Sequence, residues 1–122
     1  MALILFVDDA EHLRTVICEA LEISGHEVVF TGSGKEALRL CQKRNFDVVV
    51  TDIVMPEVDG LELIRALRTL RRELPIIAVS GASEEMLTIA TKLGANATLQ
   101  IPFDLQALLA AIDNVLRQQK SE

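Results

Sequence analysis

The sequence predicts an α/β protein with a five-stranded parallel sheet and helices on both of its faces. Two observations lead to this prediction. Apolar runs rich in β-branched residues alternate five times with segments of helical apolar spacing. The connections between them are only a few residues long and contain Gly, Pro, Ser or Asp. Strands that alternate with helices in this way run parallel, and the helices then cover the sheet.

The first strand is predicted at residues 2–7, an apolar run that ends at Asp8-Asp9. A helix is expected from Glu11, and Gly25 ends it. Its inward-facing stripe is predicted to comprise Leu13, Val16, Ile17, Ala20, Leu21 and Ser24.

The second unit pairs a short strand at residues 27–30 with a helix that Ser33 is suited to cap. The helix is expected to end at Asn45. The side chains predicted to face inward are Ala37, Leu40 and Cys41.

The third strand, Val48 to Thr51, is a continuous β-branched run typical of a strand buried on both faces. It presents Asp52 at its carboxyl end. Pro56 cannot continue a ladder, and Asp59-Gly60 is a strong turn pair. The helix that follows is predicted to bury Leu63, Ile64, Leu67 and Leu70.

The fourth strand is expected at residues 76–79, between Pro75 and Ser80-Gly81. Ser83 is suited to cap the next helix, which Gly94 ends. The inward stripe of this helix is predicted to contain Met86, Ile89, Ala90 and Leu93.

The fifth strand is predicted at residues 97–101, before Pro102, and the last helix from Asp104. Residues 117–122 are polar and are expected to be frayed or solvated. The core-facing residues of the last helix are predicted to be Leu105, Leu108, Leu109, Ile112 and Leu116.

Length and composition indicate a single domain over residues 1–122, because 122 residues with half of them hydrophobic can form one core. A net charge of −6 and a pI near 4.9 argue against direct nucleic-acid binding.

The apolar N-terminus lacks a basic leader and is too short to span a membrane, so we expect a cytoplasmic location. Cys18 and Cys41 lie in helical apolar patterns and are interpreted as buried, reduced thiols.

Three carboxylates follow two of the predicted strands. Asp8 and Asp9 end the first strand, and Asp52 ends the third. If these strands are neighbours, their ends lie roughly 5 Å apart. Like charges at that distance need compensation, and oxygen ligands of this kind suit Mg²⁺. The alternative is a set of solvated loop acids without a metal.

Ser80 ends the fourth strand at the same edge, where its hydroxyl would be able to donate to an oxygen of a bound anion. A structural role in the turn is the alternative. A carboxylate nucleophile with Mg²⁺ beside it and a hydroxyl opposite fits the capture of a phosphoryl group as an acyl phosphate.

The sequence resembles the receiver domains of two-component response regulators, of the chemotaxis-regulator type, over essentially its whole length. An Asp-Asp pair after the first strand combined with the D-x-x-M-P-x-x-D-G string is highly specific. The segments that carry the resemblance are Phe6-Val7-Asp8-Asp9, Val50 to Gly60, Ala78-Val79-Ser80-Gly81, Leu93-Gly94-Ala95 and Pro102-Phe103.

The resemblance implies a flavodoxin-like, doubly wound (βα)5 fold with strand order 2-1-3-4-5. It implies that Asp52 accepts a phosphoryl group from a sensor histidine kinase, a phosphotransfer protein or a small phosphodonor. Asp9, Asp52 and the backbone carbonyl of Val54 would hold Mg²⁺, with Asp8 acting mostly through water. Ser80 would bond a phosphoryl oxygen and move on phosphorylation.

The resemblance also implies a signalling switch and not an enzyme with turnover. Its output surface would comprise residues 83–93, 97–101 and 104–117. The partner there would be a downstream protein or an output domain. Homodimerisation through the fourth and fifth helices is a further implied possibility.

Two positions depart from the family. The lysine expected just before the proline after the fifth strand is Ile101, and the aromatic switch residue often found in that strand is Thr98. A lysine charge about 4 Å from the phosphoryl group is worth up to about 4 kcal/mol at an effective dielectric of 20. Gln100 faces the other side of the strand and is a poor substitute. Arg14, one turn into the first helix, is a speculative one.

Three hypotheses follow. The intact Asp8, Asp9, Asp52 and Ser80 favour a phosphorylation-controlled receiver. Ile101 and Thr98 instead favour an interaction module of the same fold in which phosphorylation is weak or uncoupled. A Mg²⁺-dependent phosphohydrolase acting through an aspartyl phosphate ranks third, because the sequence offers no good additional acid–base group.

Overall fold

The computed structural model describes residues 2–55, 59–81, 84–101 and 104–120, and it confirms the predicted alternation of strands and helices. The strands are β1 (Leu3–Val7), β2 (Glu27–Thr31), β3 (Val48–Asp52), β4 (Ile76–Ser80) and β5 (Ala97–Gln100). The helices are α1 (Glu11–Ile23), α2 (Gly34–Lys43), α3 (Gly60–Leu70), α4 (Glu84–Leu93) and α5 (Leu105–Lys120).

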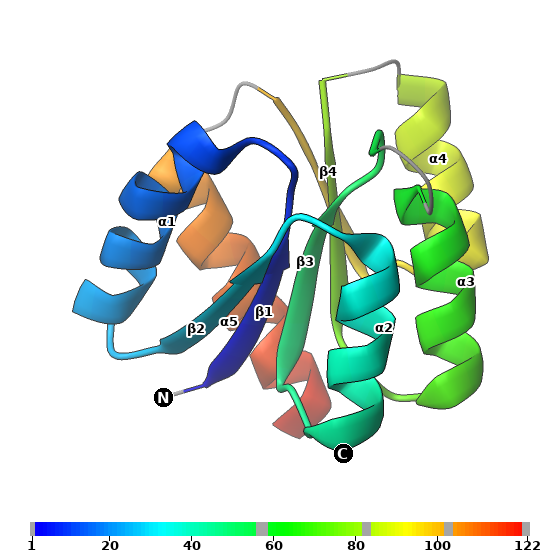
Figure 1. Ribbon diagram of the computed structural model, residues 1–122, viewed down its shortest axis with the longest axis horizontal. Coiled ribbons are helices and arrows are strands. Elements are labelled where there is room, and N and C mark those ends of the chain that lie inside the picture. The colour runs from blue at the N-terminus through cyan, green and yellow to red at the C-terminus, as the bar shows by residue number, and fades with distance from the viewer. Residues whose placement is uncertain (1, 56–58, 82–83, 102–103, 121–122) are drawn as a thin grey trace.

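All the strand pairs are parallel, and the sheet order is β2-β1-β3-β4-β5, as the flavodoxin-like fold requires (Figure 1). The order reverses direction after β1, because the chain adds β2 on one side and then returns to place β3 on the other. The β1 and β3 strands are therefore neighbours, with Val7 in register with Thr51. In such sheets the crevice at this reversal is where ligands bind.

The helices form two outer layers. In Figure 1, α1 and α5 cover one face of the sheet, and α2, α3 and α4 cover the other. Each face has its own apolar cluster, because side chains of a strand alternate between the two faces. Val49 belongs to the cluster under α2, α3 and α4, whereas Val48 and Val50 belong to the other. The prediction that β3 is buried on both faces is confirmed.

Side-chain caps fix the starts of α2 and α5, as the sequence predicted. The Ser33 hydroxyl accepts from the Glu36 N–H, which confirms the predicted cap of α2. The Asp104 carboxylate accepts from the Ala107 N–H at 2.7 Å, at the predicted start of α5. The predicted cap Ser83 lies outside the described residues.

The prediction of which helix residues face the core was partly wrong. Four apolar residues predicted to face the core are exposed: Val16, Leu70, Ile89 and Leu105. In α4, Leu87 is buried in place of Ile89, so the helix is rotated from the predicted orientation. Leu70 and Leu105 are terminal residues of their helices, where the sheet no longer covers them.

Several boundaries also differ. The helix α5 continues to Lys120, so residues 117–120 are not frayed, and the exposed Arg117 and Gln118 agree with the other expectation, that the tail is solvated. The strand β5 ends at Gln100, one residue earlier than predicted.

Both cysteines are free thiols, as predicted, but only Cys41 is buried, and Cys18 is half-buried. Among the described helices, none is long and apolar enough to cross a bilayer.

Arg68 on α3 ties this helix to the connection between α4 and β5. Its guanidinium donates to the carbonyl oxygens of Arg72 at 2.7 Å and Gly94 at 2.6 Å, and to the Asn96 side chain at 2.9 Å. Gly94 has φ +127°, and a Cβ there would meet the Arg68 side chain at 2.9 Å. The spacing of apolar residues gave no signal for this contact.

Candidate functional site

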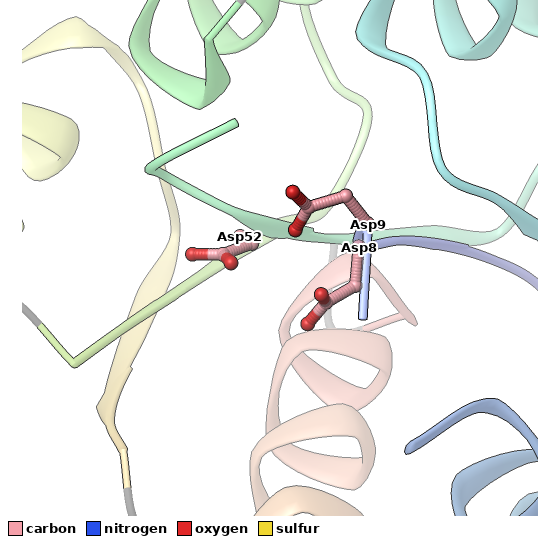
Figure 2. A group of neighbouring side chains, drawn as sticks. All are labelled: Asp8, Asp9 and Asp52. Carbon is pink, nitrogen blue, oxygen red and sulfur yellow. The ribbon is translucent and has the colours of Figure 1, made fainter. Parts of the chain in front are cut away.

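The carboxyl ends of β1 and β3 bring three carboxylates together. Asp8 and Asp9 follow β1, and Asp52 is the last residue of β3. Ligand oxygens of all three lie within 4.8 Å of one another (Figure 2). The sequence predicted this meeting on the condition that the two strands are neighbours, and the structure places the three residues together.

Backbone contacts hold two of these carboxylates. Asp8 is 2 % exposed, and its Oδ1 accepts from the Ala10 N–H at 2.8 Å. The Asp8 N–H donates to the Thr31 carbonyl at 3.0 Å, which ties this position to the end of β2. The Val54 N–H donates to Oδ1 of Asp52 at 3.2 Å. Asp9, by contrast, is exposed.

Gly60 lets α3 start directly against the Asp52 backbone. A Cβ at residue 60 would clash with the Asp52 carbonyl oxygen and would lie 2.5 Å from the Ile53 Cα. Only glycine fits this approach. The Gly60 N–H donates to the Ile53 carbonyl at 2.7 Å, and the Asp59 carboxylate accepts from the Glu62 N–H at 2.9 Å. The sequence marked Asp59-Gly60 as a turn, but gave no sign that Gly60 supports the Asp52 loop.

Burial first, then the Asp8 carboxylate and to a smaller extent Asp9, together raise the pKa of Asp52 to about 6. Hydrogen bonds from the Val54 and Ile53 backbone lower it and only partly offset these effects. Across the described ranges, no lysine or arginine is among the groups that set this pKa. The site therefore carries negative charge that a bound cation would neutralise.

The donor set fits a hard divalent cation. The available ligands are carboxylate oxygens of Asp8, Asp9 and Asp52, and no thiol or imidazole lies among them. Oxygen-only coordination suits Mg²⁺, which keeps part of its water shell. The partial exposure of Asp9 and Asp52 leaves room for such water.

Ser80 and Thr98 lie on the next two strands. Asp52 is in register with Val79, so Ser80 stands one position beyond it at the same edge. Ser80 is fully buried. Thr98 is in register with Ala78, and side-chain alternation places it on the same face as Ser80. The half-buried Thr98 lines a shallow groove beside α4.

Ile101 directly follows β5 and lies beside the end of β4. Its N–H donates to the Ser80 carbonyl at 2.8 Å, which continues the β4–β5 pairing. Its half-buried side chain packs against the apolar cluster of the α1 and α5 face. Gln100 is exposed and lines the groove on the opposite face, as the alternation predicted.

Arg14 lies at the edge of the site and not over Asp52. Its guanidinium carbon is 5.1 Å from the centre of the Phe30 ring, a cation–π arrangement. It lines a hollow of about 440 Å³ with Asp9 and Glu36. Its side chain is therefore engaged by the aromatic ring, and Asp52 gains no compensation from it.

A family model described as the response regulator receiver domain matches residues 4–113. The chain belongs to this family. Receiver domains are signalling switches of two-component systems, and they work with histidine kinases or phosphotransfer proteins and with output domains. They bind Mg²⁺ as a class, and the acidic cluster suited to it is present here.

The chain is similar to receiver domains in regulators of several lengths. It is 37% identical over 127 aligned positions to a probable transcriptional regulatory protein from Picosynechococcus sp., covering 98% of this chain and 51% of the relative. It is 36% identical to the DNA-binding transcriptional regulator NtrC of Azospirillum brasilense, covering 94% of this chain and 24% of that protein. The chain thus spans about half or less of the length of these relatives.

A solved structure supports the same fold. The CheY-like receiver domain protein from Methanospirillum hungatei superimposes with a TM-score of 0.94 at 30% identity. The match covers 99% of this chain and 98% of that one. The predicted family and fold class are therefore both confirmed.

We predict that Asp52→Asn stabilises the metal-free protein at neutral pH but not at low pH. A raised carboxyl pKa favours the neutral acid, so the contribution of Asp52 to stability is complete below the unfolded pKa of 3.8 and is lost as pH rises through about 6. After allowance for solvent screening, we expect the free energy of unfolding of Asp52→Asn at neutral pH to exceed that of the parent protein by about 1–2 kcal/mol. Urea denaturation across this pH range measures it.

Added Mg²⁺ should then stabilise the parent protein more than Asp52→Asn, because binding to the folded state raises its stability. The matched control is Asp113→Asn, which removes one exposed carboxylate on α5. A stability difference that does not change with pH would contradict the account. So would equal stabilisation of all three proteins by Mg²⁺.

Proposed function

We propose that this receiver domain takes a phosphoryl group on Asp52 in a Mg²⁺-dependent reaction. The observation that carries the proposal is the meeting of three carboxylates within 4.8 Å at the sheet reversal. In the described part of the chain, no lysine or arginine is among the groups that set the pKa of Asp52. A buried structural carboxylate would be expected to have a basic partner. Asp52 instead remains half-buried at a ligand-binding edge.

In the proposed reaction, an Asp52 carboxylate oxygen attacks the phosphorus of a phosphohistidine or an acyl phosphate. The new bond joins this oxygen to phosphorus, and the bond from phosphorus to the donor nitrogen or oxygen breaks. The leaving group keeps that electron pair, and a phosphohistidine donor takes up a proton. No oxidation or reduction is involved, and the product is an aspartyl phosphate.

Mg²⁺, when bound, would neutralise charge on the transferring phosphoryl group. Asp9, Asp52 and the Val54 carbonyl would hold it, with Asp8 contributing through water. The Val54 N–H keeps one oxygen of Asp52 oriented. The exposed position of Asp9 leaves the open side of the site to solvent and to the phosphodonor.

Ser80 and Thr98 would carry the signal toward the output face. The Ser80 hydroxyl would donate to a phosphoryl oxygen, and its movement would change the packing beside Thr98 on the α4 side of the sheet. The output surface is then α4, β5 and α5. Its partner is a downstream protein, an output domain or a second copy, with no direct nucleic-acid contact by this domain and a cytoplasmic location.

The packing of Ile101 favours a second candidate function, an interaction module in which phosphorylation is weak or uncoupled from the output face. The isoleucine supplies no charge, and its side chain is held by the apolar cluster of the α1 and α5 face. Phosphoryl capture then relies on Mg²⁺ and Ser80 alone. The two candidate functions differ in whether, without the lysine, Asp52 is still phosphorylated and the output face still responds.

Incubation with acetyl phosphate and Mg²⁺, followed by intact-mass measurement, tests the proposal. The parent protein should gain one phosphoryl group, and Asp52→Ala should gain none because it lacks the nucleophile. Asp113→Ala, which removes an exposed carboxylate elsewhere, is the matched control and should label like the parent. Labelling of Asp52→Ala, or equal labelling in EDTA, would refute the assignment.

The contribution of the missing lysine is measured by comparing Ile101→Lys with Gln100→Lys. We expect Ile101→Lys to raise the labelling rate by about tenfold or more, since a cation near the phosphoryl group stabilises its developing charge. Gln100→Lys adds the same charge on the opposite, exposed face and should change the rate little. Equal rates in the two variants would show that position 101 does not govern capture.

A further inference from the structure

The basic residues of this acidic chain gather on two neighbouring helices. Residues 34–44 and 60–73, which are α2 and α3 with the residues just after them, contain eight of the twelve basic and three of the eighteen acidic residues. Their net charge is +5, whereas the remaining four basic and fifteen acidic residues give −11. The two helices lie side by side on one face of the sheet (Figure 1). The molecule is therefore strongly polarised.

A shallow groove of about 610 Å³ runs between α2 and α3. Leu38 and Gln42 line it from α2, one turn apart. The α3 side comprises Glu62, Arg65, Ala66, Thr69 and Leu70. Most of the surface that lines the groove is apolar, in contrast to the hollow beside the acidic cluster.

The apolar part of the groove is not covered by the described parts of the chain. Leu70 is 41 % exposed, although its helical spacing predicted a core position. Leu38 and Ala66 are only half-buried. Two leucines and an alanine in a groove between helices offer the kind of recess that accepts apolar side chains of an added helix.

The cations around this groove are available for a partner. Lys35, Arg39 and Arg65 are exposed, and in the described part of the chain none of them forms an ion pair. On α2, Lys35 lies one turn from Leu38, and Arg39 lies one turn from Gln42. On α3, Arg65 lines the groove itself. An apolar recess is thus bordered by positive charge from both helices.

We propose that the groove between α2 and α3 is a docking site for an acidic amphipathic helix of a partner protein. The apolar face of that helix would lie against Leu38, Ala66 and Leu70. Its flanking carboxylates would meet Lys35, Arg39 and Arg65. This surface is separate from the acidic cluster and from the output face of α4, β5 and α5, so the inference does not depend on phosphoryl capture.

The composition of the groove favours a protein helix over the other polyanions. A nucleic-acid backbone is bound by cations and polar groups, and its phosphates would be repelled by Glu62 inside the groove. An anionic membrane would be expected to meet aromatic or large apolar side chains at the surface, and Leu70 alone is a small anchor. A second copy docked through the same face would bring two positive surfaces together.

The test uses the whole ¹⁵N-labelled chain and a synthetic helical peptide. The peptide carries Leu at i, i+4, i+7 and i+11 and Glu on both flanks, and its control has Lys in place of every Glu. We expect amide shift changes confined to α2 and α3, with a dissociation constant below about 1 mM. Arg65→Glu should weaken binding about fivefold or more, whereas Arg117→Glu, an exposed charge reversal on α5, should not.

Several results would overturn the proposal. These are no shift changes at about 1 mM peptide, shift changes on another face, equal binding of the Lys peptide, or equal weakening by the two charge reversals. Single-stranded DNA and phosphatidylserine vesicles are tested in parallel. If either perturbs the α2 and α3 amides while the Glu peptide does not, the groove serves that ligand and not a helix. Preserved spectra of both variants show that they remain folded.

Discussion

The repulsion among three carboxylates at one edge of the sheet is the interaction on which the functional account depends. Parallel strands deliver their carboxyl ends to one side, and the reversal of order after β1 makes β1 and β3 neighbours. The fold therefore brings Asp8, Asp9 and Asp52 together despite the electrostatic repulsion among their carboxylates. Burial, and after it the neighbouring Asp8 carboxylate, raises the pKa of Asp52, and a divalent cation would relieve the repulsion. A fold that brings three carboxylates together in this way is prepared for a cation.

The residues next to the acidic cluster that bear on its function lie on opposite faces of the sheet. Ser80 and Thr98 belong to the face that α4 covers, and in the proposed function a change in packing there would reach α4. Ile101 belongs to the other face and packs with the α1 and α5 cluster. Position 101, where the family resemblance leads us to expect a lysine, is therefore a half-buried apolar residue here. Substitutions on the two faces can therefore test phosphoryl capture and the response of the output face separately.

The fold class was predictable from periodic patterns, whereas the strand order that makes β1 and β3 neighbours was implied by the resemblance to receiver domains. Five alternations give the parallel sheet, and the ends of strands give Asp8, Asp9 and Asp52. The exposure of Val16 and Ile89 was not predictable, because periodicity finds an apolar stripe but not the rotation of a helix over its sheet. The long-range contact of Arg68 with the Gly94 carbonyl was also missed, since it joins elements distant in sequence.

The measurement that tests the central claim most directly is the location of the phosphoryl group. Borohydride reduces an aspartyl phosphate to an alcohol, and peptide mass mapping then identifies the modified residue. After incubation with acetyl phosphate and Mg²⁺, the account predicts modification of Asp52 and of no other residue. Modification at Asp8 or Asp9, or the absence of any modified peptide, would contradict it.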